Sequence, residues 1–134
     1  MRLLLDINII LDIVLQRPGE AASTKLIATC GQNNQAWLAW HSVATLAYLV
    51  ERQKDSATAR NLITDLLSWA QVATTGHADA LHALQMAAMR DFEDALQVAA
   101  ALACDASFII TRNTRDFVAS PVPALTPEAF LARR

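Results

Sequence analysis

The 134-residue sequence lacks features that mark several classes of protein. Its two cysteines, Cys30 and Cys104, lie far apart and outside a CxxC pattern, so neither a disulfide scaffold nor a zinc site is supported. No apolar run reaches the roughly 18 residues that a membrane-spanning helix needs. The apolar stretch from Met1 to Leu5 is too short for a signal peptide. We therefore expect a cytoplasmic protein that has no contact with a membrane.

The sequence also lacks an excess of charge of either sign. It has 11 basic and 13 acidic residues, for a formal net charge of −2. This balance argues against a nucleic-acid partner held by bulk charge alone. Glutamate is scarce, because nine of the acidic residues are aspartate and four are glutamate. Aspartate is the poorer helix former, so the bias points either to helix caps and turns or to a site for a hard divalent cation.

Apolar side chains, in contrast, are abundant, at 54% of the residues with a mean hydropathy of +0.25. This composition excludes an intrinsically disordered chain, and the length predicts a single domain over residues 1–134. Short apolar runs at 3–5, 36–40, 71–75 and 107–111 predict strands, and helical patterns separate them. Strands that alternate with helices predict an α/β fold whose parallel sheet is covered on both faces.

Several residues predict where helices begin and end. Ser42 is expected to cap a helix over residues 43–53, and Asp55 or Ser56 to cap the next helix, which reaches about Trp69. Asp79 is expected to open a helix that reaches Met89. Thr126, followed by a proline, predicts the start of a last short helix.

Aspartates occur at the points where predicted elements meet one edge of the sheet. Asp6 follows the first strand, Asp91 and Asp94 open an apolar helix, and Asp116 follows the strand at 107–111. Ligands of open parallel sheets bind beyond the carboxyl ends of the strands, so we expect these carboxylates to converge. Gathered carboxylates repel one another, and Mg²⁺ or Mn²⁺ would remove that conflict. This interpretation predicts metal-assisted chemistry on a phosphate or phosphodiester group; the alternative is that Asp6 and Asp91 only cap helices.

Four segments resemble PIN-domain proteins, in the order in which that family has them. They are LLDINIILD at 4–12, DFEDALQ at 91–97, IITRNTRDF at 109–117 and PALTPEAF at 123–130. The resemblance spans nearly the whole chain and concerns the small stand-alone PIN proteins, which include VapC-type toxins. It implies a three-layer α/β/α sandwich with a mainly parallel sheet. It also implies a Mg²⁺- or Mn²⁺-dependent endoribonuclease that cuts single-stranded RNA, the toxin of a toxin–antitoxin pair.

The resemblance also assigns roles to individual residues. Asp6, Asp94 and Asp116 match the family's acidic metal ligands and would be the catalytic residues. They would hold one or two Mg²⁺ ions, which activate a water that attacks the scissile phosphate. The other matched positions are Asp91 as a further metal ligand, Asn8 and Asn113 as polar supports beside the first and last aspartates, and Arg112 as a contact to RNA phosphate or a solvated side chain.

One position departs from the family pattern. Many PIN nucleases carry a glutamate on the helix after the second strand, where this sequence has Tyr48, or Thr45 if the alignment shifts. Glu51 lies three residues beyond Tyr48 on roughly the same helix face and is the candidate substitute, unless it is only a surface charge. The departure leaves a second hypothesis open: a non-catalytic PIN-like module that binds RNA or protein through a degraded metal site.

The remaining expectations concern partners and substrate. We expect an RNA substrate, an antitoxin protein and a homodimer, with the helices between residues 20 and 69 as the candidate protein-binding surface. A third hypothesis is a phosphatase-like enzyme or a DNA-directed nuclease that uses the same acids.

Overall fold

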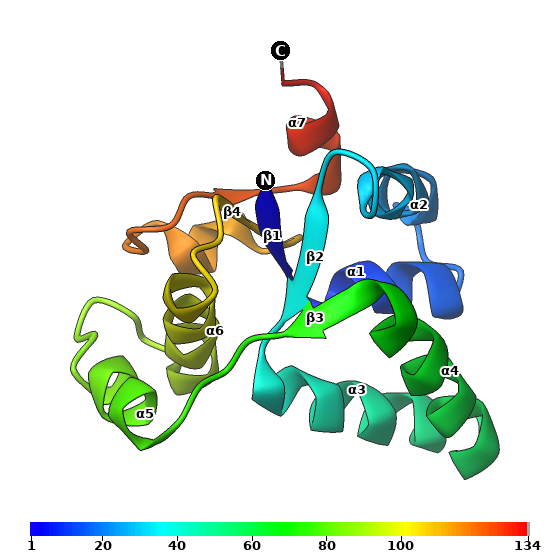
Figure 1. The fold of residues 1–134 in the computed structure, drawn as a ribbon, viewed down its shortest axis with the longest axis horizontal. Coiled ribbons are helices and arrows are strands. Elements are labelled where there is room, and N and C mark those ends of the chain that lie inside the picture. Colours follow the sequence, from blue (N-terminus) through cyan, green and yellow to red (C-terminus); the bar gives the residue numbers. More distant parts are fainter. Residues whose placement is uncertain (134) are drawn as a thin grey trace.

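The computed structural model describes residues 1–133 and has a central sheet with helices on both faces (Figure 1). The strands are β1 (Arg2–Leu5), β2 (Gln35–Leu38), β3 (Ala70–Val72), β4 (Phe108–Ile110) and β5 (Ala124–Leu125). Their order in the sheet is β3-β2-β1-β4-β5, and every neighbouring pair is parallel. The first strand of the chain therefore lies in the middle of the sheet.

The helices divide into two layers. They are α1 (Ile7–Val14), α2 (Glu20–Thr29), α3 (Trp40–Gln53), α4 (Ser56–Trp69), α5 (His77–Leu84), α6 (Phe92–Ala103) and α7 (Pro127–Leu131), with a 3₁₀ helix, η1 (Thr114–Phe117). Helices α1 to α4 and α7 pack on one face of the sheet, and α5, α6 and η1 pack on the other (Figure 1). This confirms the three-layer α/β/α sandwich. Within residues 1–133, no helix is long and apolar enough to cross a membrane.

The apolar run of β1 follows from burial on both faces. Leu3 and Leu5 pack into the core beneath α1 to α4, whereas Leu4 between them packs into the core beneath α6. All three side chains are fully buried. A strand covered on both faces needs apolar residues at every position rather than at alternate positions, which is why the sequence predicts β1 well.

Several predicted helix starts are confirmed by side-chain caps. Asp55 Oδ1 accepts a hydrogen bond from the backbone N–H of Thr58 at 2.6 Å, at the start of α4. Thr126 Oγ1 accepts from the backbone N–H of Ala129 at 3.1 Å, with Pro127 at the first position of α7. Each cap satisfies a backbone N–H that has no partner within its own helix.

Other predicted boundaries are wrong. Helix α3 begins at Trp40, so Ser42 lies inside the helix, where its buried hydroxyl accepts a hydrogen bond from Gln97 instead of capping the helix. Helix α5 ends at Leu84, and Met89 packs into the core beneath α6 rather than extending the helix. Contacts with α6 decide both positions, and local sequence patterns do not report such contacts.

Candidate metal centre

Asp6 lies directly after β1 and is held from two sides. As the N-cap of α1, its Oδ1 accepts hydrogen bonds from the backbone N–H of Asn8 at 3.1 Å and from Asn8 Nδ2 at 3.3 Å. Its Oδ2 accepts from Thr111 Oγ1, just after β4, at 2.9 Å. Arg17 Nη1 in turn donates to Asn8 Oδ1 at 3.1 Å. Burial raises the pKa of Asp6, although these hydrogen bonds oppose the shift. The carboxylate therefore has a fixed orientation at the carboxyl end of β1.

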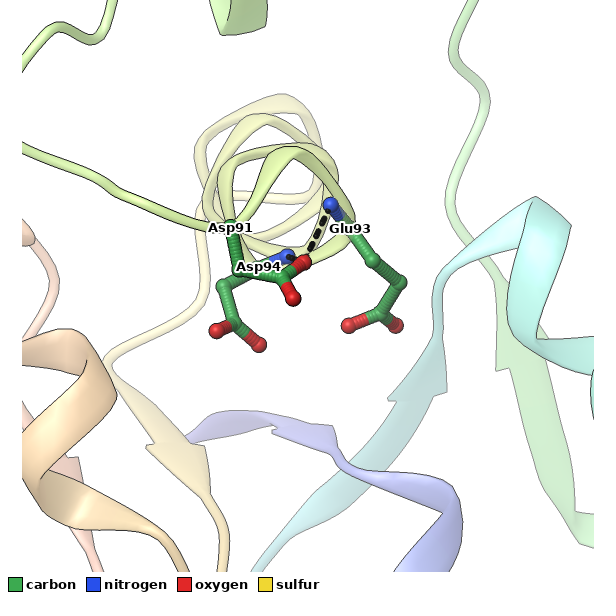
Figure 2. A group of neighbouring side chains, drawn as sticks. All are labelled: Asp91, Glu93 and Asp94. Atoms are coloured by element: carbon green, nitrogen blue, oxygen red, sulfur yellow. Dashed lines mark hydrogen bonds between the residues drawn. The ribbon is translucent and has the colours of Figure 1, made fainter.

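Three more carboxylates lie at the start of α6. Asp91, Glu93 and Asp94 each offer an oxygen, and these oxygens lie within 4.8 Å of one another (Figure 2). Asp91 caps the helix through Oδ1, which accepts from the backbone N–H groups of Glu93 at 2.8 Å and Asp94 at 3.3 Å. The alternative role of Asp91, as a helix cap, is thus present, and its other oxygen is not used by the cap. The helix N-terminus favours negative charge at these positions.

Electrostatic effects connect these groups across three segments of the chain. Partial burial, and after it the charges of Glu93, Asp91 and Asp116, together raise the pKa of Asp94 to about 7. Glu93 also raises the pKa of Asp6. We call Asp6, Asp91, Glu93, Asp94 and Asp116 the acidic cluster. The three carboxylates at the start of α6 lie together, and the charges of Glu93 and Asp116 act on Asp6 and Asp94 respectively. The convergence of Asp6, Asp94 and Asp116 on one cation stays a prediction.

Sequence reasoning assigned no role to Glu93. His41 Nε2, in the first turn of α3, lies 3.0 Å from Glu93 Oε1, and Gln97 Nε2 donates to the same oxygen at 3.1 Å. The hydrogen bond from His41 is the main reason why the pKa of Glu93 is lowered. The one signal in the sequence was the position of Glu93 between two aspartates in the first turn of an expected helix.

Within residues 1–133, no hydrogen bond or ion pair joins the α3 candidates to the acidic cluster. Thr45 Oγ1 donates within its own helix to the carbonyl of His41. Glu51 lies ten residues beyond His41, which is about 15 Å along the helix axis, and lines a groove between α3 and α4. Tyr48, in the position where the family has glutamate, is 57% exposed. No contact of Thr45, Tyr48 or Glu51 with the acidic cluster supports their predicted roles, which stay predictions.

The residues around Asp116 are arranged by Thr111. Asn113 donates its backbone N–H to Thr111 Oγ1 at 3.1 Å, and its carbonyl accepts from the backbone N–H of Asp116 at 3.1 Å. The same threonine hydroxyl therefore contacts Asp6 and the loop that leads to Asp116. Asn113 supports this loop through its backbone, and a direct role of its side chain stays a prediction.

Arg112 is engaged within the protein. Its Nε donates to Asp12 Oδ2 at 3.0 Å, and Nη1 donates to both carboxylate oxygens of Glu128 at 2.7 and 2.6 Å. Its Nη2 donates to the Gly19 carbonyl at 2.9 Å and to Ser23 Oγ at 3.1 Å. We call these five residues the arginine network. It joins the end of β4 to α1, α2 and α7, and a contact of Arg112 with RNA stays a prediction.

The acidic cluster fits a hard divalent cation. Its side chains offer carboxylate oxygens, which Mg²⁺ and Mn²⁺ prefer over nitrogen or sulfur donors. The raised pKa of Asp94 reflects burial first and then repulsion from neighbouring carboxylates, and a bound cation would relieve that repulsion. Among residues 1–133, the basic side chain that contacts the cluster is His41, through Glu93. Donor type, grouping and charge thus agree with the metal that the resemblance implies.

Comparisons with known proteins agree with this architecture. The sequence matches the profile of the PIN domain family over residues 2–115. No significant relative is found among curated proteins. Among solved structures, VapBC-1 from nontypeable Haemophilus influenzae has 18% identity and a TM-score of 0.74, over 96% of this chain and 99% of that chain. VapBC2 from Rickettsia felis, bound to a DNA fragment from its promoter, has 17% identity and a TM-score of 0.75, over 94% and 98%. A toxin–antitoxin complex from Klebsiella pneumoniae has 18% identity and a TM-score of 0.71, over 92% and 96%. With a profile match over most of its length and the same fold, the chain belongs to the PIN-domain family.

Proposed function

We propose that the chain is a Mg²⁺- or Mn²⁺-dependent endoribonuclease that cuts single-stranded RNA, and that it is the toxin of a toxin–antitoxin pair. The observation that carries the proposal is the group of three carboxylates at the start of α6, whose oxygens lie within 4.8 Å of one another. The charge interactions of Asp6 with Glu93 and of Asp116 with Asp94 support it. Perturbed carboxyl groups at the carboxyl edge of a parallel sheet are typical of functional sites. Membership of the PIN-domain family supports the same conclusion.

In this proposal, Asp6, Asp94 and Asp116 hold the cation, and Asp91 contributes the carboxylate oxygen that its cap does not use. A divalent cation there would polarise a phosphoryl oxygen and make a water more acidic. The side chains of the chain itself supply position and charge. Asn8 and Thr111 hold the Asp6 carboxylate in one orientation before any ligand arrives, which reduces the cost of ordering it on binding.

The direct test is cleavage of a single-stranded RNA in the presence of Mg²⁺. Asp6→Asn removes one charge from the acidic cluster and keeps the shape of the side chain, so we expect at least a hundredfold loss of cleavage rate, on the order of a lost electrostatic catalytic group. Asp65→Asn, at an exposed position on α4, is the control for a lost charge and should retain the full rate. Equal rates in wild type and Asp6→Asn would disprove the proposal.

A substrate panel distinguishes the proposed substrate from its alternatives. Single-stranded RNA, single-stranded DNA, duplex DNA and a simple phosphomonoester are compared under the same conditions. We expect cleavage of the RNA and little reaction with the others. Preferential cleavage of DNA, or release of phosphate from the monoester, would favour the DNA-directed nuclease or the phosphatase-like enzyme.

The toxin role rests on the similarity to the Klebsiella pneumoniae toxin–antitoxin complex. We expect growth arrest when the chain is expressed alone, and no arrest with Asp6→Asn. Co-expression of the protein encoded by an adjacent small reading frame should restore growth and form a complex that survives size-exclusion chromatography. Normal growth with active, soluble protein would contradict this part of the proposal.

We also propose that the chain forms a homodimer. Trp40 and Tyr48, both on α3, are 70% and 57% exposed, and large exposed aromatic side chains are enriched at protein interfaces. Light scattering coupled to size-exclusion chromatography should give twice the mass of the chain, and a monomer at micromolar concentration would contradict this expectation.

The non-catalytic module remains the second candidate because α3 supplies no glutamate at the position of Tyr48. That hypothesis predicts no binding of Mn²⁺ at millimolar concentration and no growth arrest. The two candidates therefore differ in a binding measurement that needs no substrate.

A further inference from the structure

The first turn of helix α3 contacts the start of α6 through polar side chains and not through a carboxylate. Tyr48 is 57% exposed, and its hydroxyl accepts a hydrogen bond from Arg52 at 3.3 Å, so this position belongs to the surface. In the first turn of α3, however, His41 contacts Glu93 and the hydroxyl of Ser42 contacts Gln97. The two contacts join the start of α3 to the start of α6.

Glu93 is held at one of its two carboxylate oxygens. His41 Nε2 at 3.0 Å and Gln97 Nε2 at 3.1 Å both contact Oε1. Among the described residues, no N–H group donates to Oε2, although the protonated carboxyl group of Asp94 forms a hydrogen bond with the Glu93 carboxylate. Glu93 also belongs to the group whose oxygens lie within 4.8 Å of one another, together with Asp91 and Asp94 (Figure 2). The side chain is therefore oriented through one oxygen and can offer the other to a ligand.

Gln97 is a buried polar residue of α6 whose side chain is only partly hydrogen-bonded. Its side chain is 2% exposed, and its Nε2 bridges Glu93 Oε1 and Ser42 Oγ. Its Oε1 is buried and has no hydrogen-bond partner within residues 1–133. A buried acceptor without a partner destabilises a fold, and an apolar residue at this position of α6 would avoid that penalty. A glutamine that orients Glu93 explains why a polar side chain lies there.

We propose that Glu93 is a further carboxylate ligand of the metal centre, beside the four aspartates, and that it replaces the glutamate that other PIN nucleases carry on α3. His41 and Gln97 are its positioning residues. This inference rests on the proposed function, since it concerns the same cation. It departs from the expectation that Glu51 is the substitute, because Glu51 lies about 15 Å along α3 from His41. A glutamate carboxylate is then supplied from α6 instead of α3.

The test is the affinity of the full chain for Mn²⁺, measured by isothermal titration calorimetry without RNA. We expect Glu93→Gln to raise the Kd by at least about tenfold, the lower end of what supporting residues of metal sites contribute. Glu51→Gln tests the rival position and should bind as the wild type does, as should the charge control Asp65→Asn. Circular dichroism of each metal-free variant shows that its fold is intact.

The positioning role of His41 is tested by a pair of variants. His41→Ala removes the contact with Glu93 Oε1, whereas His41→Gln keeps an N–H donor at a similar distance from the backbone. We expect His41→Ala to weaken Mn²⁺ binding and His41→Gln to restore most of the affinity, while both unfold at similar temperatures without metal. A purely structural histidine would change the unfolding temperature and leave the affinity unchanged.

The outcomes separate this inference from the proposed function. If the wild type binds Mn²⁺ and Glu93→Gln binds it equally well, Glu93 is not a ligand, and the proposed function stands on the aspartates. If Glu51→Gln alone weakens binding, the substitute lies on α3 and the inference is wrong. If the wild type binds no Mn²⁺, the proposed metal-dependent function is wrong, and the inference about Glu93 is wrong with it.

Discussion

Two charged sites lie next to each other at the end of β4, and they differ in whether their carboxylates are paired with a basic side chain. Thr111 donates to Asp6 in the acidic cluster, and the next residue, Arg112, is the centre of the arginine network. In the arginine network, one guanidinium contacts the carboxylates of Asp12 and Glu128. In the acidic cluster, five carboxylates have a single contact with a basic side chain among the described residues, that of His41.

The pKa values reflect this difference. Arg112 lowers the pKa of Glu128, and although burial opposes it, the hydrogen bonds to Glu128 and Asp12 raise the pKa of Arg112. In the acidic cluster, burial and neighbouring charges raise the pKa of Asp94 to about 7, and burial raises that of Asp6. The arginine network stabilises the folded chain without a ligand. In the acidic cluster, the repulsion between carboxylates destabilises the metal-free fold, and a bound cation would reduce it.

The backbone is also adapted to the arginine network. Gly19, between α1 and α2, has a φ of +107°, and a Cβ built there would lie 2.7 Å from Arg112 Nη2. Both the left-handed conformation and the close approach of the guanidinium require glycine at this position. The close contact shows that α1 and α2 are arranged around Arg112.

The largest expected effect comes from breaking the arginine network. Arg112→Leu leaves the Asp12 side chain, which is 6% exposed, without its cation. We expect a loss of about 3 kcal/mol in the free energy of unfolding, because removal of one partner strands a buried charge. Urea denaturation measures the loss, and Arg115→Leu, at an exposed position, is the matched control. A loss below about 1 kcal/mol would mean that Asp12 is stabilised by Ser23 alone.

The next effect is the response of the acidic cluster to a cation. Mn²⁺ at a hundred times its Kd should stabilise the wild type by about 2.7 kcal/mol, because it binds only the folded chain. Thermal unfolding with and without Mn²⁺ measures this gain. Asp6→Asn should lose most of it, whereas Glu128→Gln in the arginine network should keep it. Equal stabilisation of both variants by Mn²⁺ would show that the cation does not bind at the acidic cluster.

A smaller effect is expected from neutralising Asp94 in the metal-free protein. Because its folded-state pKa is raised to about 7, the protonated form stabilises the fold, and this contribution is complete below the ordinary pKa of about 4 and lost as the pH rises through 7. Asp94→Asn should therefore unfold at a higher temperature than the wild type at pH 8, and the difference should shrink toward pH 4. A destabilised Asp94→Asn at pH 8 would show that burial and the neighbouring charges do not penalise the ionised Asp94 carboxylate.

The smallest effect is expected at the outer edge of the arginine network. The Glu128 side chain is 53% exposed, and exposed ion pairs contribute about 0.2–1 kcal/mol. Glu128→Gln should lower the free energy of unfolding by no more than that, and added salt should reduce the difference between variant and wild type. A loss as large as that of Arg112→Leu would mean that Glu128, rather than Asp12, is the principal partner.

Local patterns in the sequence predict a large part of the fold. The strand at the start of the chain, the caps at Asp55, Asp91 and Thr126, and the α/β order all depend on neighbours within a few residues. The sequence also predicts that Asp6, Asp94 and Asp116 converge, since parallel strands bring their carboxyl ends to one edge. These features need only the order of elements along the chain.

Contacts between distant residues are the part that could not be predicted. His41 and Glu93 are 52 residues apart, Ser42 and Gln97 are 55 apart, and Arg112 and Asp12 are 100 apart. Each pair depends on how two elements pack, so a pattern read within one element does not contain it. For this reason the sequence predicts Ser42 as a cap, and it does not predict the partners of Arg112 within the protein.

By itself, the sequence determined the elements, the α/β arrangement and the edge where the acids gather, because helix and strand signals act over a few residues and a parallel sheet aligns its strand ends. Only the tertiary structure decided which charges are paired. It buried Asp12 against Arg112, turned Tyr48 toward the surface, and oriented Glu93 between His41 and Gln97. Pairing depends on distances of about 3 Å between side chains of separate elements, and packing alone sets those distances.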